Sequence, residues 1–103
     1  MRLRFAAAAA RDLESILDDI ALDSPAGAES VGRAVMAAGE RLTTFPDMGR
    51  PGRLPGTREF PLPGLPYLLV YEADSDALTI LAVFHGARDL ARALAERRRE
   101  LKR

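Results

Sequence analysis

The amino-acid sequence predicts one α+β domain over residues 1–103, with a helical hairpin packed on one face of an antiparallel sheet. Two observations carry this prediction. Apolar residues recur at helical spacing through most of residues 7–44, and three β-rich segments separated by short turns lie between residues 58 and 84. The resulting order, β-α-α-β-β-β-α, is typical of helices and an antiparallel sheet packed around one core.

The N-terminal part predicts a short strand and two helices. Residues 1–5 alternate in polarity and form a candidate edge strand. A helix over about residues 7–22 follows from apolar residues at i, i+3, i+4 and i+7, namely Leu13, Ile16, Leu17 and Ile20. Ser24 and Pro25 suit the N-cap and first position of a second helix. That helix ends near residue 42 or 44, and its apolar stripe consists of Val31, Val35, Ala38 and Leu42.

The remaining chain predicts a connector, three strands and a short helix. Three prolines and three glycines in residues 45–56 exclude regular structure there. Strands are expected near residues 58–62, 67–71 and 78–84, and the turns at 63–66 and 74–76 join them as an antiparallel meander. A short basic C-terminal helix begins near Leu90, with Leu94 and Leu101 as its apolar residues.

Composition narrows the class of protein. Hydrophobic residues make up 48% and charged residues 29% of the chain, which is ordinary for a globular protein. The absence of cysteine excludes disulfides and thiolate metal sites. No apolar run approaches the roughly 20 residues of a membrane-spanning helix, and the run at residues 5–10 is too short for a secretory signal. We therefore expect a cytoplasmic protein with no membrane partner.

Charge is unevenly distributed along a chain whose net charge is zero. Residues 1–49 carry five Arg against eight Asp or Glu, giving −3, and residues 50–103 carry ten Lys or Arg against seven Asp or Glu, giving +3. The asymmetry indicates that the C-terminal half meets an acidic partner. A merely solvated basic helix explains it equally well.

The first group of candidate functional residues is basic. A planar guanidinium suits phosphate or carboxylate ligands. Arg50 and Arg53 lie on the connector, Arg58 begins a strand, and Arg88 follows the last strand. Together these four would form a basic patch for nucleic acid. The alternative for Arg50 and Arg53 is that they are soluble loop residues.

The second group is aromatic. Tyr67 and Tyr71 are four residues apart on one strand and point to the same face, as core residues or as base-stacking platforms. His85 ends the last strand, where an imidazole would transfer protons or hydrogen-bond the sheet end. Phosphate-loop, nucleophile and metal-cluster motifs are absent from the sequence, so we expect no metal and no cofactor.

Several short segments share the order and spacing of a known family. They are Ala9, Arg11, Asp12, Leu13 and Ile16; Phe45, Pro46, Gly49 and Arg50; residues 56–59; residues 66–71; and residues 80–89. Together they resemble the RelE/ParE superfamily of bacterial toxins from type II toxin–antitoxin operons, also called plasmid stabilisation proteins. The resemblance implies the fold described above. It also implies a cognate antitoxin that wraps the toxin and covers an apolar groove.

The superfamily divides by target. RelE-like members cut messenger RNA on the ribosome, with basic residues on the phosphate and a C-terminal Tyr or His transferring protons. In this chain Leu68 stands where these members often carry arginine. Arg88 matches their phosphate-binding arginine, but no Tyr or His follows it. If the chain were such an endoribonuclease, the resemblance makes His85, Arg88 and Arg58 the candidate catalytic residues.

ParE-like members bind and poison DNA gyrase without catalytic residues of their own. The tail from Phe84 to Arg97 resembles theirs, so ParE-like inhibition of gyrase is the favoured interpretation. Candidate binding residues are Arg50, Arg53, Arg58, Tyr67, Arg88, Arg92 and Arg97. The alternatives are a RelE-like ribosome-dependent endoribonuclease and a degenerate, non-toxic antitoxin-binding module. Whether the chain is an enzyme depends on this choice.

Overall fold

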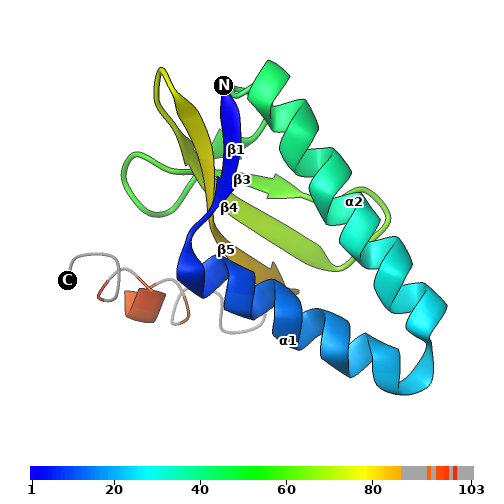
Figure 1. The fold of residues 1–103 in the computed structure, drawn as a ribbon. Coiled ribbons are helices and arrows are strands. Elements are labelled where there is room, and N and C mark those ends of the chain that lie inside the picture. The colour runs from blue at the N-terminus through cyan, green and yellow to red at the C-terminus, as the bar shows by residue number, and fades with distance from the viewer. Residues whose placement is uncertain (87–92, 94, 98, 100–103) are drawn as a thin grey trace.

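Two helices lie on one face of a five-stranded sheet in the computed structural model, which describes residues 1–86, 93, 95–97 and 99 (Figure 1). The elements follow one another as β1 (Arg2–Phe5), α1 (Ala7–Asp23), α2 (Pro25–Thr44), β2 (Arg50–Pro51), β3 (Arg58–Pro61), β4 (Tyr67–Ala73) and β5 (Ala77–His85). The predicted α+β architecture is confirmed.

The sheet has the strand order β1-β5-β4-β3-β2. Strands β3, β4 and β5 form the predicted antiparallel meander. Strand β1 occupies an edge, as expected, but it runs parallel to β5, with Arg2 opposite Ala77 and Phe5 opposite Ile80. The sheet is therefore mixed rather than entirely antiparallel. A parallel neighbour requires a crossover, and the long chain between β1 and β5 supplies it.

The other edge corrects the expectation that residues 45–56 hold no regular structure. Arg50 and Pro51 form the short strand β2, which pairs antiparallel with Glu59 and Arg58 of β3. A proline lacks the N–H that a central strand needs, so it is tolerated only on an edge such as this one. The connector is consequently fastened to the sheet instead of lying free of it.

The helical hairpin begins and turns where the sequence predicts. Ser24 is the N-cap of α2: its Oγ accepts a hydrogen bond from the N–H of Gly27 at 2.9 Å, and Pro25 occupies the first turn. Helices α1 and α2 meet at this turn and diverge toward the sheet (Figure 1).

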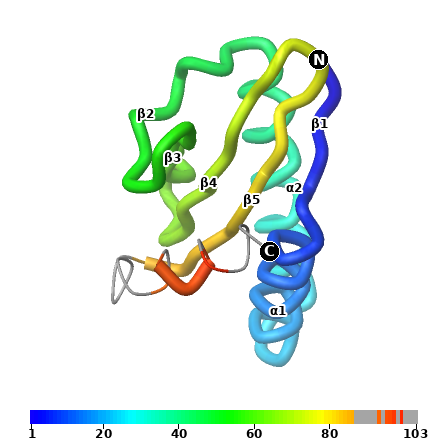
Figure 2. Tube along the Cα trace, turned by 90° about the vertical axis from the view of Figure 1, so that its left-hand side faces the viewer, coloured from blue at the N-terminus to red at the C-terminus, as the bar shows by residue number. Residues whose placement is uncertain are grey.

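Two apolar clusters occupy the two faces of the sheet. The larger lies between the sheet and the helices and includes Tyr67, Leu69 and Tyr71 of β4. The smaller consists of Leu54, Leu68, Val70 and Ala82 on the opposite face, called here the open face. Figure 2 looks onto that face, with β4 and β5 in front of α2. Burial on both faces explains the nearly continuous apolar run of β4.

Tyr67 and Tyr71 share a face, as predicted, despite a register irregularity between Val70 and Tyr71. The described part of the C-terminal segment, residues 93, 95–97 and 99, is helical, and Arg97 within it contacts Leu81 and Phe84 of β5. Arg88 and Arg92 fall outside the described residues. Among the residues described, no helix combines the length and the apolar character needed to cross a bilayer.

Candidate functional site

A buried carboxylate gathers two of the predicted arginines on the open face. The side chain of Glu59 is 2% exposed, and it faces this side together with its cross-strand neighbour Val70. Its Oε2 accepts a hydrogen bond from the backbone N–H of Arg53 at 2.9 Å, and its Oε1 lies 3.4 Å from Nη2 of Arg50 and 3.9 Å from Nη1 of Arg53. Two guanidinium groups share one carboxylate, so the cluster keeps a net positive charge.

Tyr71 holds the connector that carries these arginines. Its hydroxyl accepts a hydrogen bond from the N–H of Gly49 at 2.9 Å and donates one to the carbonyl oxygen of Pro46 at 2.7 Å. Burial raises the pKa of Tyr71 above its ordinary value, and this effect outweighs the hydrogen bond from Gly49, which lowers it. The approach is so close that a Cβ on Gly49 would lie 2.6 Å from the hydroxyl oxygen. Any larger residue there would force the connector or Tyr71 to shift.

Arg58 lies on the other face of the sheet. Neighbouring residues on a strand alternate sides, so Arg58 points toward the helix side while Glu59 points to the open face. Its Nη1 donates to the carbonyl oxygens of Gly49 at 2.7 Å and Asp47 at 3.4 Å, and Nη2 lies 3.5 Å from the carboxylate of Asp47. Arg50 and Arg53 come together, whereas Arg58 is separated from them and braces the connector.

Tyr67 and His85 meet at the end of the sheet. They are paired across β4 and β5, and their rings contact edge to face with centroids 5.3 Å apart and planes at 72°. The imidazole is exposed, whereas the tyrosine is 9% exposed. Gly86 then turns the chain with a φ of +66°, which favours glycine, and donates its N–H to the carbonyl oxygen of Pro66 at 2.6 Å.

Some of these residues, Arg50, Arg53, Tyr67 and Gly86, border one cleft of about 260 Å³. This open-face cleft is lined by Arg50, Arg53, Pro61, Leu65, Pro66, Tyr67, Leu68 and Gly86. Two guanidinium groups beside apolar side chains suit an acidic side chain or a phosphate that also presents apolar surface. Among the described lining residues there is no carboxylate or imidazole to serve as general base. The arrangement is therefore suited to binding more than to proton transfer.

The remaining predicted residues are placed differently. The side chain of Arg97 is 12% exposed and lies against Asp12 of α1, with Nη2 2.8 Å from Oδ1. Arg88 and Arg92 lie outside the described residues. Across the described part of the chain, no group of three His, Cys, Asp or Glu side chains is arranged to hold a metal ion.

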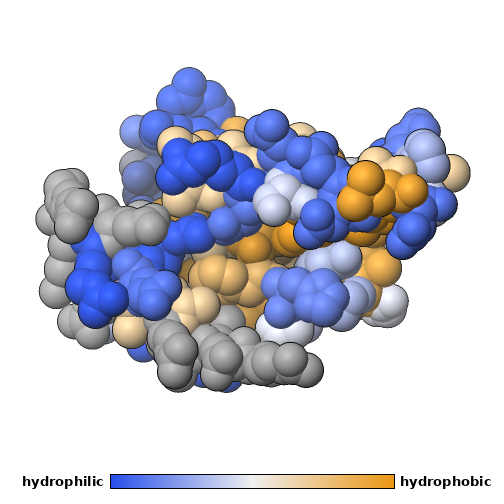
Figure 3. Space-filling model, turned by 90° about the horizontal axis from the view of Figure 1, so that it is seen from below, coloured by the Kyte–Doolittle hydropathy of each residue, from blue (hydrophilic) through white to orange (hydrophobic). Residues whose placement is uncertain are grey.

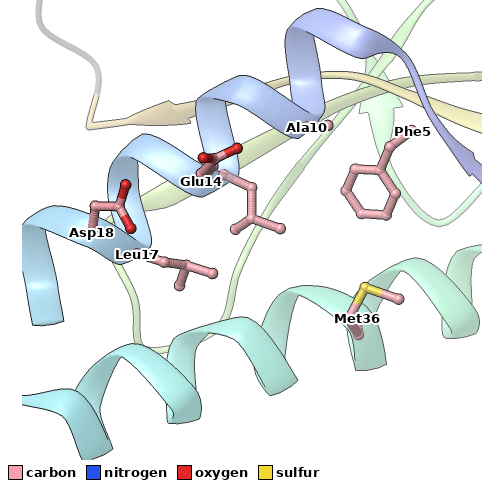
Figure 4. A pocket seen from close by; sticks show the side chains of 7 residues that line it. Phe5, Ala10, Glu14, Leu17, Asp18 and Met36 are labelled. Carbon is pink, nitrogen blue, oxygen red and sulfur yellow. The ribbon is translucent and has the colours of Figure 1, made fainter.

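An apolar groove runs between the two helices. A hollow of about 450 Å³ is lined by Phe5, Ala10, Leu13, Glu14, Leu17, Asp18 and Met36. It shares Leu17 and Met36 with a second hollow of about 610 Å³ that extends along α2 to Ala28 and Gly32. Figure 4 shows Phe5, Leu17 and Met36 directed into the gap between α1 and α2. We call this surface the helix groove.

Sequence reasoning did not assign the residues of the helix groove. Leu17 belongs to the predicted core stripe of α1, but the small residues Ala28 and Gly32 opposite it leave its outer side uncovered. Met36, which is 46% exposed, falls outside the predicted stripe of α2. The view from below also shows hydrophobic side chains at the surface between hydrophilic ones (Figure 3). Exposed apolar surface of this kind usually marks an interaction site.

Known proteins are similar to this chain in sequence and in fold. Residues 3–90 match the family described as the ParE toxin of the type II toxin–antitoxin system, parDE. The match assigns this fold, a helical hairpin on a small sheet, to a class of toxins. The chain belongs to the ParE toxin family, and the resemblance found in its sequence is confirmed.

One relative and one solved structure show how far the similarity extends. The relative, "Putative toxin Y4kP" of Sinorhizobium fredii (strain NBRC 101917 / NGR234), is 36% identical over 85 residues, which cover 82% of this chain and 88% of that protein. A chain of the structure "Chromosomal ParDE TA system from P. aeruginosa" superposes with a TM-score of 0.74 at 24% identity. That match covers 84% of this chain and 97% of the other and supports the fold.

Proposed function

We propose that this toxin inhibits DNA gyrase in the bacterial cytoplasm and that a cognate antitoxin neutralises it. The observation that carries the proposal is the match to the ParE toxin family over residues 3–90. Gyrase inhibition is the activity that the ParE-like resemblance implies. It requires a binding surface and no catalytic residues.

The chemistry of the open-face cleft favours binding over RNA cleavage. Leu68, buried on the open face, stands where RelE-like members often place arginine. His85 contacts the ring of Tyr67, and among the described residues no carboxylate forms a hydrogen bond or ion pair with its imidazole. A metal-free nuclease needs both a phosphate clamp and a positioned acid and base. The described lining of the cleft supplies a candidate clamp, Arg50 and Arg53, without a positioned acid and base.

The helix groove is the surface that we assign to the antitoxin. It is open and mostly apolar, and its exposed methionine resembles the adaptable side chains used at binding surfaces. An amphipathic helix of the antitoxin would bury its apolar face between α1 and α2. Glu14 and Asp18 on α1 and Arg33 on α2 line the groove and would orient the polar side of that helix.

Inducible expression in a bacterium tests the proposal. Growth, the DNA damage response and the integrity of messenger RNA are followed together, with and without co-expressed antitoxin. We expect growth arrest, filamentation and an induced damage response with intact transcripts, and relief of all three effects by the antitoxin. Arrest with cleaved transcripts and no damage response would replace gyrase by a ribosome-dependent nuclease activity. Unimpaired growth would leave only antitoxin binding.

A further inference from the structure

A carboxylate and a guanidinium join two segments that are 85 residues apart in the chain. Asp12 projects from α1, and Arg97 belongs to the helical residues near the C-terminus. Nη2 of Arg97 donates to Oδ1 of Asp12 at 2.8 Å, and Nη1 donates to Oδ2 at 3.0 Å. Two parallel, charge-assisted hydrogen bonds of this kind are stronger and more directional than a single ion pair.

The same two side chains also form hydrogen bonds with backbone groups at the edge of β5. Strand β1 covers that edge only as far as Ile80, so the backbone groups beyond it need other partners. The N–H of Val83 donates to Oδ2 of Asp12 at 3.0 Å, and the carbonyl oxygen of Leu81 accepts from Nη1 of Arg97 at 2.9 Å. The pair therefore takes the place of a strand at the end of the sheet.

Phe84 adds a third contact. The guanidinium carbon of Arg97 lies 5.5 Å from the centre of the Phe84 ring, within the range of a cation–π interaction. Phe84 in turn packs against the apolar cluster of the open face. We call the set Asp12, Leu81, Val83, Phe84 and Arg97 the clasp.

We propose that the clasp positions the C-terminal segment for recognition of the target, and that Arg97 acts through the clasp and not by touching the target. This inference rests on the proposed function and deepens it, because it adds that the C-terminal residues, whose stretch from Phe84 to Arg97 resembles ParE-like tails, take part in gyrase binding. Arg97 directs its guanidinium inward, onto α1 and β5, and its side chain is only 12% exposed. Asp12, which sequence reasoning left unassigned, becomes a positioning residue.

The larger core explains why the clasp can be tested without unfolding the protein. The buried cluster between sheet and helices contains Leu42, Leu69 and Ile80, and neither Asp12 nor Arg97 is a member of it. Asn at position 12 keeps an oxygen for the N–H of Val83 but removes the charge and one of the two acceptor oxygens that hold Arg97. The variant should therefore release the C-terminal segment and leave the sheet intact.

Inhibition of purified DNA gyrase, read as loss of plasmid supercoiling, is the first measurement. If release leaves the segment positioned about a tenth of the time, the inhibitory concentration rises about tenfold. We expect this rise in Asp12→Asn, in Arg97→Gln and, with no further increase, in the double variant. Asp19→Asn, an exposed carboxylate change on the same helix, should match the wild type. Impairment by Arg97→Gln alone would show that Arg97 contacts gyrase directly and would overturn the proposal.

Limited trypsin cleavage separates this proposal from the gyrase proposal. Residues 87–103 contain seven Lys or Arg, and Asp12→Asn and Asp19→Asn leave all of them in place. Cleavage after Arg97 and Arg99, the two sites among the described helical residues, should be about tenfold faster in Asp12→Asn than in Asp19→Asn, because it follows the population of the released form. Equal rates would refute the clasp even if gyrase is inhibited. Faster cleavage would support it even if the wild type leaves gyrase untouched.

If Asp12→Asn fails to fold, the rate of amide hydrogen exchange in Arg97→Gln tests whether loss of the clasp releases the C-terminal segment. Faster exchange at residues 93–99, with β4 unchanged, would support release of the segment. Unchanged exchange at residues 93–99 would overturn the proposal.

Discussion

At the scale of single residues, the hydroxyl of Tyr71 determines where the connector lies. It is a fully buried side chain whose two hydrogen bonds reach Gly49 and Pro46 across the core. Tyr71→Phe keeps the ring and leaves the N–H of Gly49 and the carbonyl of Pro46 without that partner. The loss should lower the free energy of unfolding by about 1–3 kcal/mol, measured by urea denaturation at neutral pH.

The matched control is Tyr67→Phe, because the Tyr67 hydroxyl makes no hydrogen bond with the described residues. This substitution should change the free energy of unfolding by less than about 0.5 kcal/mol.

The dependence of stability on alkaline pH gives a second test of the role of Tyr71. The pKa of Tyr71 is raised in the folded state, so above its ordinary value of 10.0 the unfolded chain loses the proton first. Stability should fall with pH there, and less steeply in Tyr71→Phe. Equal slopes would contradict the assignment.

The roles of some residues could be predicted from the sequence. The grouping of Arg50 with Arg53 follows from their closeness on one connector, and the core role of Tyr71 follows from its strand. Glu59 was missed because a buried carboxylate carries no local signature; only the fold brings both arginines to it. Asp12 was missed for the same reason, since its partner Arg97 lies 85 residues away.

At the scale of elements, the glycines of the connector and of α2 play different parts. A Cβ on Gly49 would come within 2.8 Å of the Tyr71 ring and 2.9 Å of the carbonyl oxygen of Glu59. A Cβ on Gly32 would meet Leu17 at 3.6 Å, an ordinary contact. Gly49→Ala should therefore destabilise the fold by about 1–3 kcal/mol. Gly32→Ala should stabilise it by up to about 1 kcal/mol through helix propensity.

Thermal or urea unfolding of these two variants checks the expectation, and far-UV circular dichroism confirms that each is folded. A harmless Gly49→Ala would show that the connector has room to move away from Tyr71. The connector would then not be fixed by Tyr71, and neither would the positions of Arg50 and Arg53.

The elements themselves were largely predictable. Helical spacing located α1 and α2, and Ser24 with Pro25 marked the boundary between them. Two features of the sheet could not be predicted from the sequence. Strand β2 is only two residues long and is defined by its pairing with β3, so no local sequence pattern predicts it. The direction of β1 also depends on its distant neighbour β5, and five alternating residues carry no information on that choice.

At the scale of the whole molecule, the helix groove and the open-face cleft lie on different surfaces. The groove is formed by β1, α1 and α2, and the cleft by the connector, β3, β4 and the end of β5. If the antitoxin binds the helix groove, as we propose, a substitution in the groove should weaken its binding without altering the cleft.

Met36→Glu tests the groove. A charge at this half-exposed position should weaken binding of the cognate antitoxin at least about tenfold, because the apolar partner surface would have to cover it. Leu22→Glu is the control: Leu22 is 85% exposed and lines neither hollow of the groove. Calorimetric titration of both variants measures the affinities. Equal affinities would place the antitoxin elsewhere on the surface.

A supercoiling assay with purified DNA gyrase, relaxed plasmid and this protein, with and without its antitoxin, tests gyrase inhibition most directly. We expect the protein to block supercoiling and to trap cleaved DNA, and we expect prior addition of the antitoxin to restore normal activity. Normal supercoiling at a large excess of the protein, together with ribosome-dependent cleavage of messenger RNA, would show that gyrase is not the target.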